Sequence, residues 1–222
     1  MKKETNNAIY IYDVEDKSLI DEISIFMDDN SKRIIDFFEL DNIDKPLINI
    51  VKSKEELDKI FVKFNKPKEE VPKWLIGMST SDMNIYCLSL NDYKNTTHAF
   101  KEEEYDKALN NYKKTVLHEY IHYVNRCFCK LNNSEFSIKY LSEGIASYFS
   151  NQKEDIIINF DYSINDLLNS NNCYDGWFLI TKYIIEKYPK KILLELLLNK
   201  NKAKEFLENK YIEIKNYYIK NN

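Results

Sequence analysis

The chain has 222 residues, 44% of them hydrophobic and 31% charged, a balance typical of a globular protein with a sizeable core. A formal net charge of −4 gives no electrostatic reason to expect nucleic-acid binding. The N-terminus lacks the apolar run of a signal peptide, and the apolar run from Ile192 to Leu198 is too short to span a bilayer. We therefore expect no membrane partner, a cytoplasmic location and cysteines that remain thiols.

Strand and helix patterns alternate along the first part of the chain. Apolar and β-branched residues predict a strand from Ala8 to Val14, and helical spacing of apolar residues follows from Lys17 to about Leu40. A second strand is predicted from Leu47 to Val51. A capping box that begins at Ser53 then predicts a helix to about Phe64.

A predicted hairpin separates this part from a long helical region. Its strands run from Trp74 to Thr80 and from Met83 to Leu90, and we expect them at one side of a small mixed sheet. From about Glu102 the pattern is helical almost to the end, with further helices predicted at 135–149, 165–169, 174–188, 190–198 and 203–219. Ser134 or Asn133 could cap the first of these. This order predicts an α+β protein with one unit, 1–222, made of an α/β part (1–100) and a helical part (101–222).

The motif with the clearest chemistry is His118-Glu119-Tyr120-Ile121-His122, an H-E-x-x-H pattern. Residues four apart lie on one face of a helix, so the two imidazoles could bind one Zn²⁺. Glu119 would project from a neighbouring direction and could reach a water on that metal. Two of the three histidines of the chain lie in this motif, which favours a metal site over a chance match.

A catalytic zinc site needs a third protein ligand, and Glu143 is the best candidate. It lies early in a predicted helix that follows the motif after a short connection, and Gly144 leaves room there for a close approach. His98, in a polar loop, is the weaker alternative. Cys127 and Cys129 diverge on a helix and do not indicate a metal site.

Together these motifs resemble those of a known enzyme group. His118-Glu119-x-x-His122 followed by Leu141-Ser142-Glu143-Gly144-Ile145-Ala146 resembles the gluzincin zinc metallopeptidases, the thermolysin and aminopeptidase-N kind, and especially their small bacterial members. Residues 72–77 and 85–90 resemble the strand pair that ends in the edge strand of the active site. Residues 174–178 resemble a tyrosine–glycine helix start of these peptidases, so the resemblance covers about residues 72–190.

The resemblance implies a zincin-like fold with the motif helix at the junction of its two parts. His118, His122 and Glu143 would be the zinc ligands, and Glu119 would be the general base that activates zinc-bound water. A peptide or protein substrate would bind along the edge strand 85–90, within the segment 83–90. Tyr174, or as second choice Tyr183, would donate to the oxyanion. In a chain with 17 tyrosines, simple packing of either ring is the alternative.

Some features depart from the group and leave alternatives open. The spacing from His122 to Glu143 is longer than in aminopeptidase N, and Ser147 stands where thermolysin has an aspartate. The Gly-Ala-Met-Glu-Asn motif of aminopeptidases is absent, which favours an endopeptidase over an aminopeptidase. A catalytically idle zincin fold that serves as a binding or regulatory module is the alternative of a different class, and the intact Glu119 argues against it.

Overall fold

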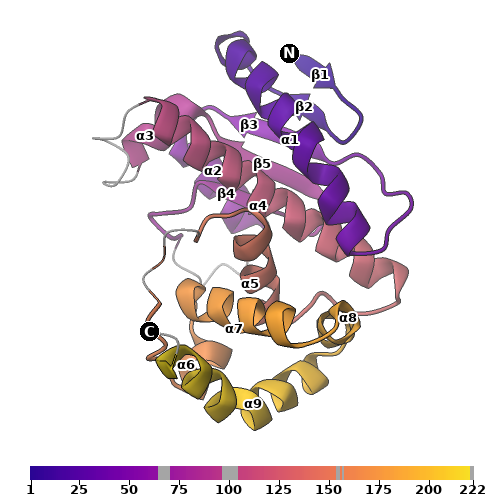
Figure 1. Cartoon of the computed structure of the whole chain (residues 1–222). Helices are drawn as coiled ribbons and strands as arrows, with labels where there is room; N and C mark the ends of the chain where they lie inside the picture. Colours follow the sequence, from indigo (N-terminus) through magenta and orange to yellow (C-terminus); the bar gives the residue numbers. More distant parts are fainter. Residues whose placement is uncertain (65–70, 97–104, 154–155, 157, 221–222) are drawn as a thin grey trace. The chain divides into compact units, whose positions relative to one another are not determined.

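The computed structural model describes residues 1–64, 71–96, 105–153, 156 and 158–220, and within them five short strands form one mixed sheet (Figure 1). The strands are β1 (Lys2–Glu4), β2 (Ile9–Ile11), β3 (Leu47–Val51), β4 (Gly77–Ser79) and β5 (Asn84–Leu88), in the order β1-β2-β3-β5-β4. Pairing is parallel for β2–β3 and β3–β5 and antiparallel at both outer pairs. The predicted small mixed sheet and its hairpin are therefore confirmed.

The prediction that residues 85–90 form the edge strand is wrong. β5 pairs with β3 on one side and with β4 on the other, so its backbone groups are used by both neighbours. Residues 89 and 90 lie beyond the strand, and Leu90 begins α3 (Leu90–Thr96). In the described part of the chain the outer strand on this side is β4, which is shorter than predicted because a turn joins Pro72 to Leu75 just before it.

Helices cover both faces of this sheet. α1 (Lys17–Phe37) and the first half of α4 (Tyr105–Leu131) lie against the face that presents Tyr10 and Cys87 (Figure 1). The burial of Tyr10 and its proximity to Asp28 of α1 and Tyr120 of α4 raise the pKa of its hydroxyl. α1 follows the predicted helix closely, since its buried residues recur at helical spacing.

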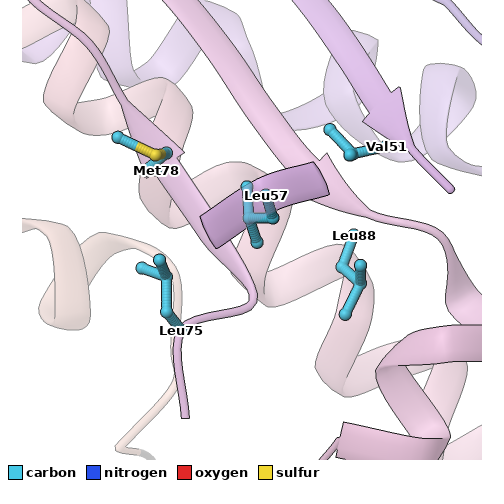
Figure 2. Packing of buried hydrophobic residues seen from close by; sticks show 5 residues of the cluster. All are labelled: Val51, Leu57, Leu75, Met78 and Leu88. Carbon is cyan, nitrogen blue, oxygen red and sulfur yellow. The ribbon is translucent and has the colours of Figure 1, made fainter. Parts of the chain in front are cut away.

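α2 (Lys54–Phe64) closes the other face through a small apolar cluster. Its residue Leu57 is fully buried among Val51, Leu75, Met78 and Leu88 (Figure 2). The predicted N-cap is present, because Ser53 Oγ accepts the N–H of Glu56 at 3.3 Å. This cluster ties β4 to the middle of the sheet.

The C-terminal region consists of helices in the residues that the structure describes. They are α5 (Lys139–Phe149), α6 (Ile164–Asn169), α7 (Tyr174–Lys187), α8 (Lys190–Leu198) and α9 (Lys200–Lys220). Tyrosine hydroxyls join them to one another: Tyr140 donates to the carbonyl of Ala203 at 2.7 Å, and Tyr218 donates to that of Leu179 at 2.7 Å. The predicted all-helical C-terminal part is therefore confirmed.

The start of α5 differs from the prediction, which placed it near Ser134. Asn133 takes a left-handed backbone conformation with φ 52°. The N–H of Ser134 donates to the carbonyl of Cys129 at 2.9 Å, so these residues close the end of α4 in a Schellman motif. Ser134 thus terminates one helix instead of capping the next, and α5 begins only at Lys139.

The chain divides into two compact units, Met1–Val124 and Asn125–Asn222. The predicted division near residue 100 falls earlier than this one, because the first half of α4 contacts the sheet and α1. Lys113, for example, forms an ion pair with Glu22 of α1 at 3.0 Å. All four cysteines are described, and each is buried outside any disulfide. Among the described residues, no helix combines the length and the apolar character that crossing a membrane requires.

Candidate metal centre

α4 holds the histidine motif in a largely buried environment. Its neighbours Leu117, Tyr120 and Ile121 are fully buried, so the helix is fixed on several sides. His118 is 7% exposed and His122 is 8% exposed. The two side chains lie one turn apart on the same face, as predicted from their spacing.

The two imidazoles point their Nε2 atoms at each other. The Nε2–Nε2 distance is 3.1 Å, and the ring centroids are 4.7 Å apart. Two nitrogen ligands of one tetrahedral zinc would be separated by about 3.3 Å, given Zn–N bonds of about 2.0–2.1 Å. The pair therefore already has close to the separation that a shared metal ion needs.

Glu143 completes a group that could hold a metal ion. One ligand atom each from His118, His122 and Glu143 lies within 4.8 Å of the other two, and this is the one such group among the described residues. Imidazole nitrogens with one carboxylate oxygen are a donor set that suits zinc and leaves room for a water. The three predicted ligands are thus brought together, whereas His98 lies outside the described residues.

The position of Glu143 on α5 depends on the glycine that follows it. A methyl group added at Gly144 would lie 2.1 Å from Oγ1 of Thr181 and 2.4 Å from the carbonyl oxygen of Trp177, both on α7. No larger residue fits there, so α5 and α7 touch through their backbones. Gly144 does allow a close helix approach, but the helix that approaches is α7 and not the motif helix α4.

Glu119 lies over the outer hairpin of the sheet. A methyl group added at Gly77 of β4 would lie 3.1 Å from its Cγ and 3.4 Å from its Oε1. Cys87, which faces Gly77 across the β4–β5 pair, has a pKa raised by burial and further by the charge of Glu119. Glu119 is 8% exposed. Its carboxyl group therefore lies beside β4, on the face of the sheet that α1 and α4 cover.

No protein-family model, curated protein or solved structure matches the chain.

The two tyrosine candidates have different surroundings. Tyr183 is 2% exposed, and its hydroxyl donates to the carboxylate of Glu213 on α9. Burial and that hydrogen bond raise the pKa of the Tyr183 hydroxyl, which fits a structural role. Tyr174 is the first residue of α7, partly buried, with its ring edge-on to Trp177 at a centroid distance of 5.1 Å. Its predicted donation to an oxyanion stays a prediction.

The sequence did not predict which residues lie next to Glu119. Gly77, Cys87 and Thr115 adjoin it, although none of them belongs to a metal or catalytic motif. The chain has only three glycines, and Gly77 falls inside a predicted strand. A glycine in a strand can mark a close approach by another group, so Gly77 could have indicated this contact. Ser147 of α5 stands where thermolysin has an aspartate. It is buried, and its hydroxyl has no hydrogen-bond partner within the described residues.

Proposed function

We propose that the chain is a zinc metallopeptidase of the gluzincin type with a zincin-like fold. The observation that carries the proposal is the group of His118, His122 and Glu143 on α4 and α5. Glu119 adds a buried carboxylate directly after the first of these ligands. Three ligands and a neighbouring carboxylate are the requirements for metal-assisted hydrolysis of an amide.

When bound, zinc would supply Lewis acidity, which polarises a carbonyl and lowers the pKa of water to about 7. Glu119 would accept a proton from the attacking water and pass it to the amine that leaves. Glu119 is 8% exposed, so its carboxylate is largely shielded from bulk water. Tyr174 would donate a hydrogen bond to the oxyanion.

The outer edge of β4 is the surface that an extended peptide would use. The hydrogen bonds at either end of β4, accepted by Ile76 and donated by Thr80, point toward β5. Because bonding direction alternates along an antiparallel strand, Gly77 and Ser79 direct their N–H and C=O groups away from β5. A substrate strand could pair with those groups beside Glu119, which replaces the expected binding along residues 85–90.

Peptides with free and with acetylated N-termini test the proposal and its alternatives. We expect the zinc-loaded chain to cleave acetylated peptides internally and a metal chelator to stop the cleavage. Cleavage of the free peptides alone would identify an aminopeptidase. A chain that binds one zinc and cleaves neither set, nor a denatured protein, would be a catalytically idle binding module.

A further inference from the structure

We infer that Gly77 is a positioning residue for the general base, because its lack of a side chain lets Glu119 lie against the edge strand. This inference rests on the proposed function and assigns a role to a residue outside the metal motifs.

The backbone of β4 does not itself require glycine at this position. None of the three glycines of the chain has a positive φ, so Gly77 takes a conformation that other residues adopt. Glycine inside a strand costs about 0.5–1 kcal/mol relative to alanine, since more backbone freedom is lost on folding. A buried glycine in a three-residue strand therefore indicates a close approach by another group.

The group that approaches is the side chain of Glu119. A methyl group at Gly77 would be 3.1 Å from Glu119 Cγ and 3.4 Å from Thr115 Cγ2, one turn earlier on α4. Thr115 cannot easily give way, because its hydroxyl donates back to the carbonyl of Asn111 at 3.1 Å and its residue is buried. At 3.1 Å the neighbour must give by a few tenths of an ångström, and Glu119 can do so by a small rotation about its first side-chain bonds.

Such a rotation moves the carboxylate, which lies beyond Cγ on the same side chain. Cys87 limits where it can go, since that residue is fully buried next to Glu119 on β5. A displacement of about 1 Å in a reacting group can cost about 100-fold in rate, so a shift of a few tenths of an ångström should cost about 3- to 10-fold. Binding of the metal depends on His118, His122 and Glu143 and should be unaffected.

The test combines unfolding and catalysis in Gly77→Ala, Glu119→Ala and the double variant. In urea, with chelator present, Gly77→Ala should raise the unfolding constant of the full chain about tenfold. In the Glu119→Ala background, where the crowded Cγ is absent, Gly77→Ala should change the unfolding constant by less than about threefold in either direction. Gly176→Ala is the matched control: its methyl group would meet Leu167 Cδ2 at 2.7 Å, far along the chain from Glu119, and its effect should be equal in both backgrounds.

With zinc restored, Gly77→Ala should bind one zinc per chain and show a kcat that is about 3- to 10-fold lower, with KM within about twofold. Equal effects of Gly77→Ala on unfolding in both backgrounds would overturn the inference. So would an unchanged kcat. If the wild-type chain hydrolyses nothing, the proposed function is wrong, and the unfolding comparison still accepts or rejects the Gly77–Glu119 contact on its own.

Discussion

The Nε2 atoms of His118 and His122 lie 3.1 Å apart. At the scale of single residues, the decisive question is therefore which residue is the third metal ligand. Glu143 has a carboxylate oxygen within 4.8 Å of a ring nitrogen of each histidine, and it lies on a helix that is held by its neighbour α7. A carboxylate as third ligand balances part of the charge of the metal ion, which matters where water is largely excluded.

Substitution of Glu143 should therefore remove the metal. We expect Glu143→Ala to lower zinc affinity by at least about 100-fold, because a two-ligand site lacks both the charge and the geometry of the original. Zinc content measured after dialysis against a weak chelator checks this. His98→Ala, the substitution of the other histidine, should retain one zinc per chain, and the opposite pattern would make His98 the ligand.

At the scale of elements, the contact of α5 with α7 positions Glu143. Gly144→Ala would press a methyl group against the Trp177 carbonyl at 2.4 Å, and backbone cannot move aside as the end of a flexible side chain can. We expect a loss of about 1–3 kcal/mol in the free energy of unfolding, and weaker zinc binding because Glu143 shifts with the helix. Urea unfolding and zinc titration measure the two effects.

Ser147→Ala is the control for that substitution. Ser147 lies one turn further along α5, and its buried hydroxyl has no hydrogen-bond partner within the described residues. Removing it should be neutral or slightly stabilising, since no buried group is left without a partner. A loss as large as that of Gly144→Ala would mean that α5 is sensitive to any change and that the glycine has no special role.

Sequence patterns predicted the elements well where local physics dominates. The helical spacing around His118 and His122 and the capping residue Ser53 depend on near neighbours, and both predictions are confirmed. Ser134 looked like a cap, but it closes α4 and donates to the carbonyl of Leu198, a partner that only the folded chain provides. The place of β4 outside β5 and the contact of Gly77 with Glu119 likewise depend on distant pairing, which residue spacing does not encode.

At the scale of the whole molecule, a bound metal ion should contribute to stability. Ligands that bind only the folded chain stabilise it by about 2.7 kcal/mol at a concentration 100 times Kd. For a chain of this size that corresponds to an increase in Tm of about 5–10 °C. We expect added zinc to raise Tm of the chelator-treated protein by this amount.

His122→Ala should abolish the zinc-dependent increase in Tm, whereas Glu119→Gln should retain it. A zinc effect of equal size in His122→Ala would place the metal at another site. Differential scanning calorimetry with and without added zinc makes the comparison in one experiment.

The most direct test of the central claim compares hydrolysis by the wild-type chain and by Glu119→Gln, both loaded with zinc. We expect both proteins to bind one zinc per chain and the wild type to cleave peptides until chelator is added. Glu119→Gln should be at least about 100-fold slower, because its side chain cannot accept the proton. Equal turnover by the two proteins, or a wild-type chain that cannot be loaded with zinc, would contradict the claim.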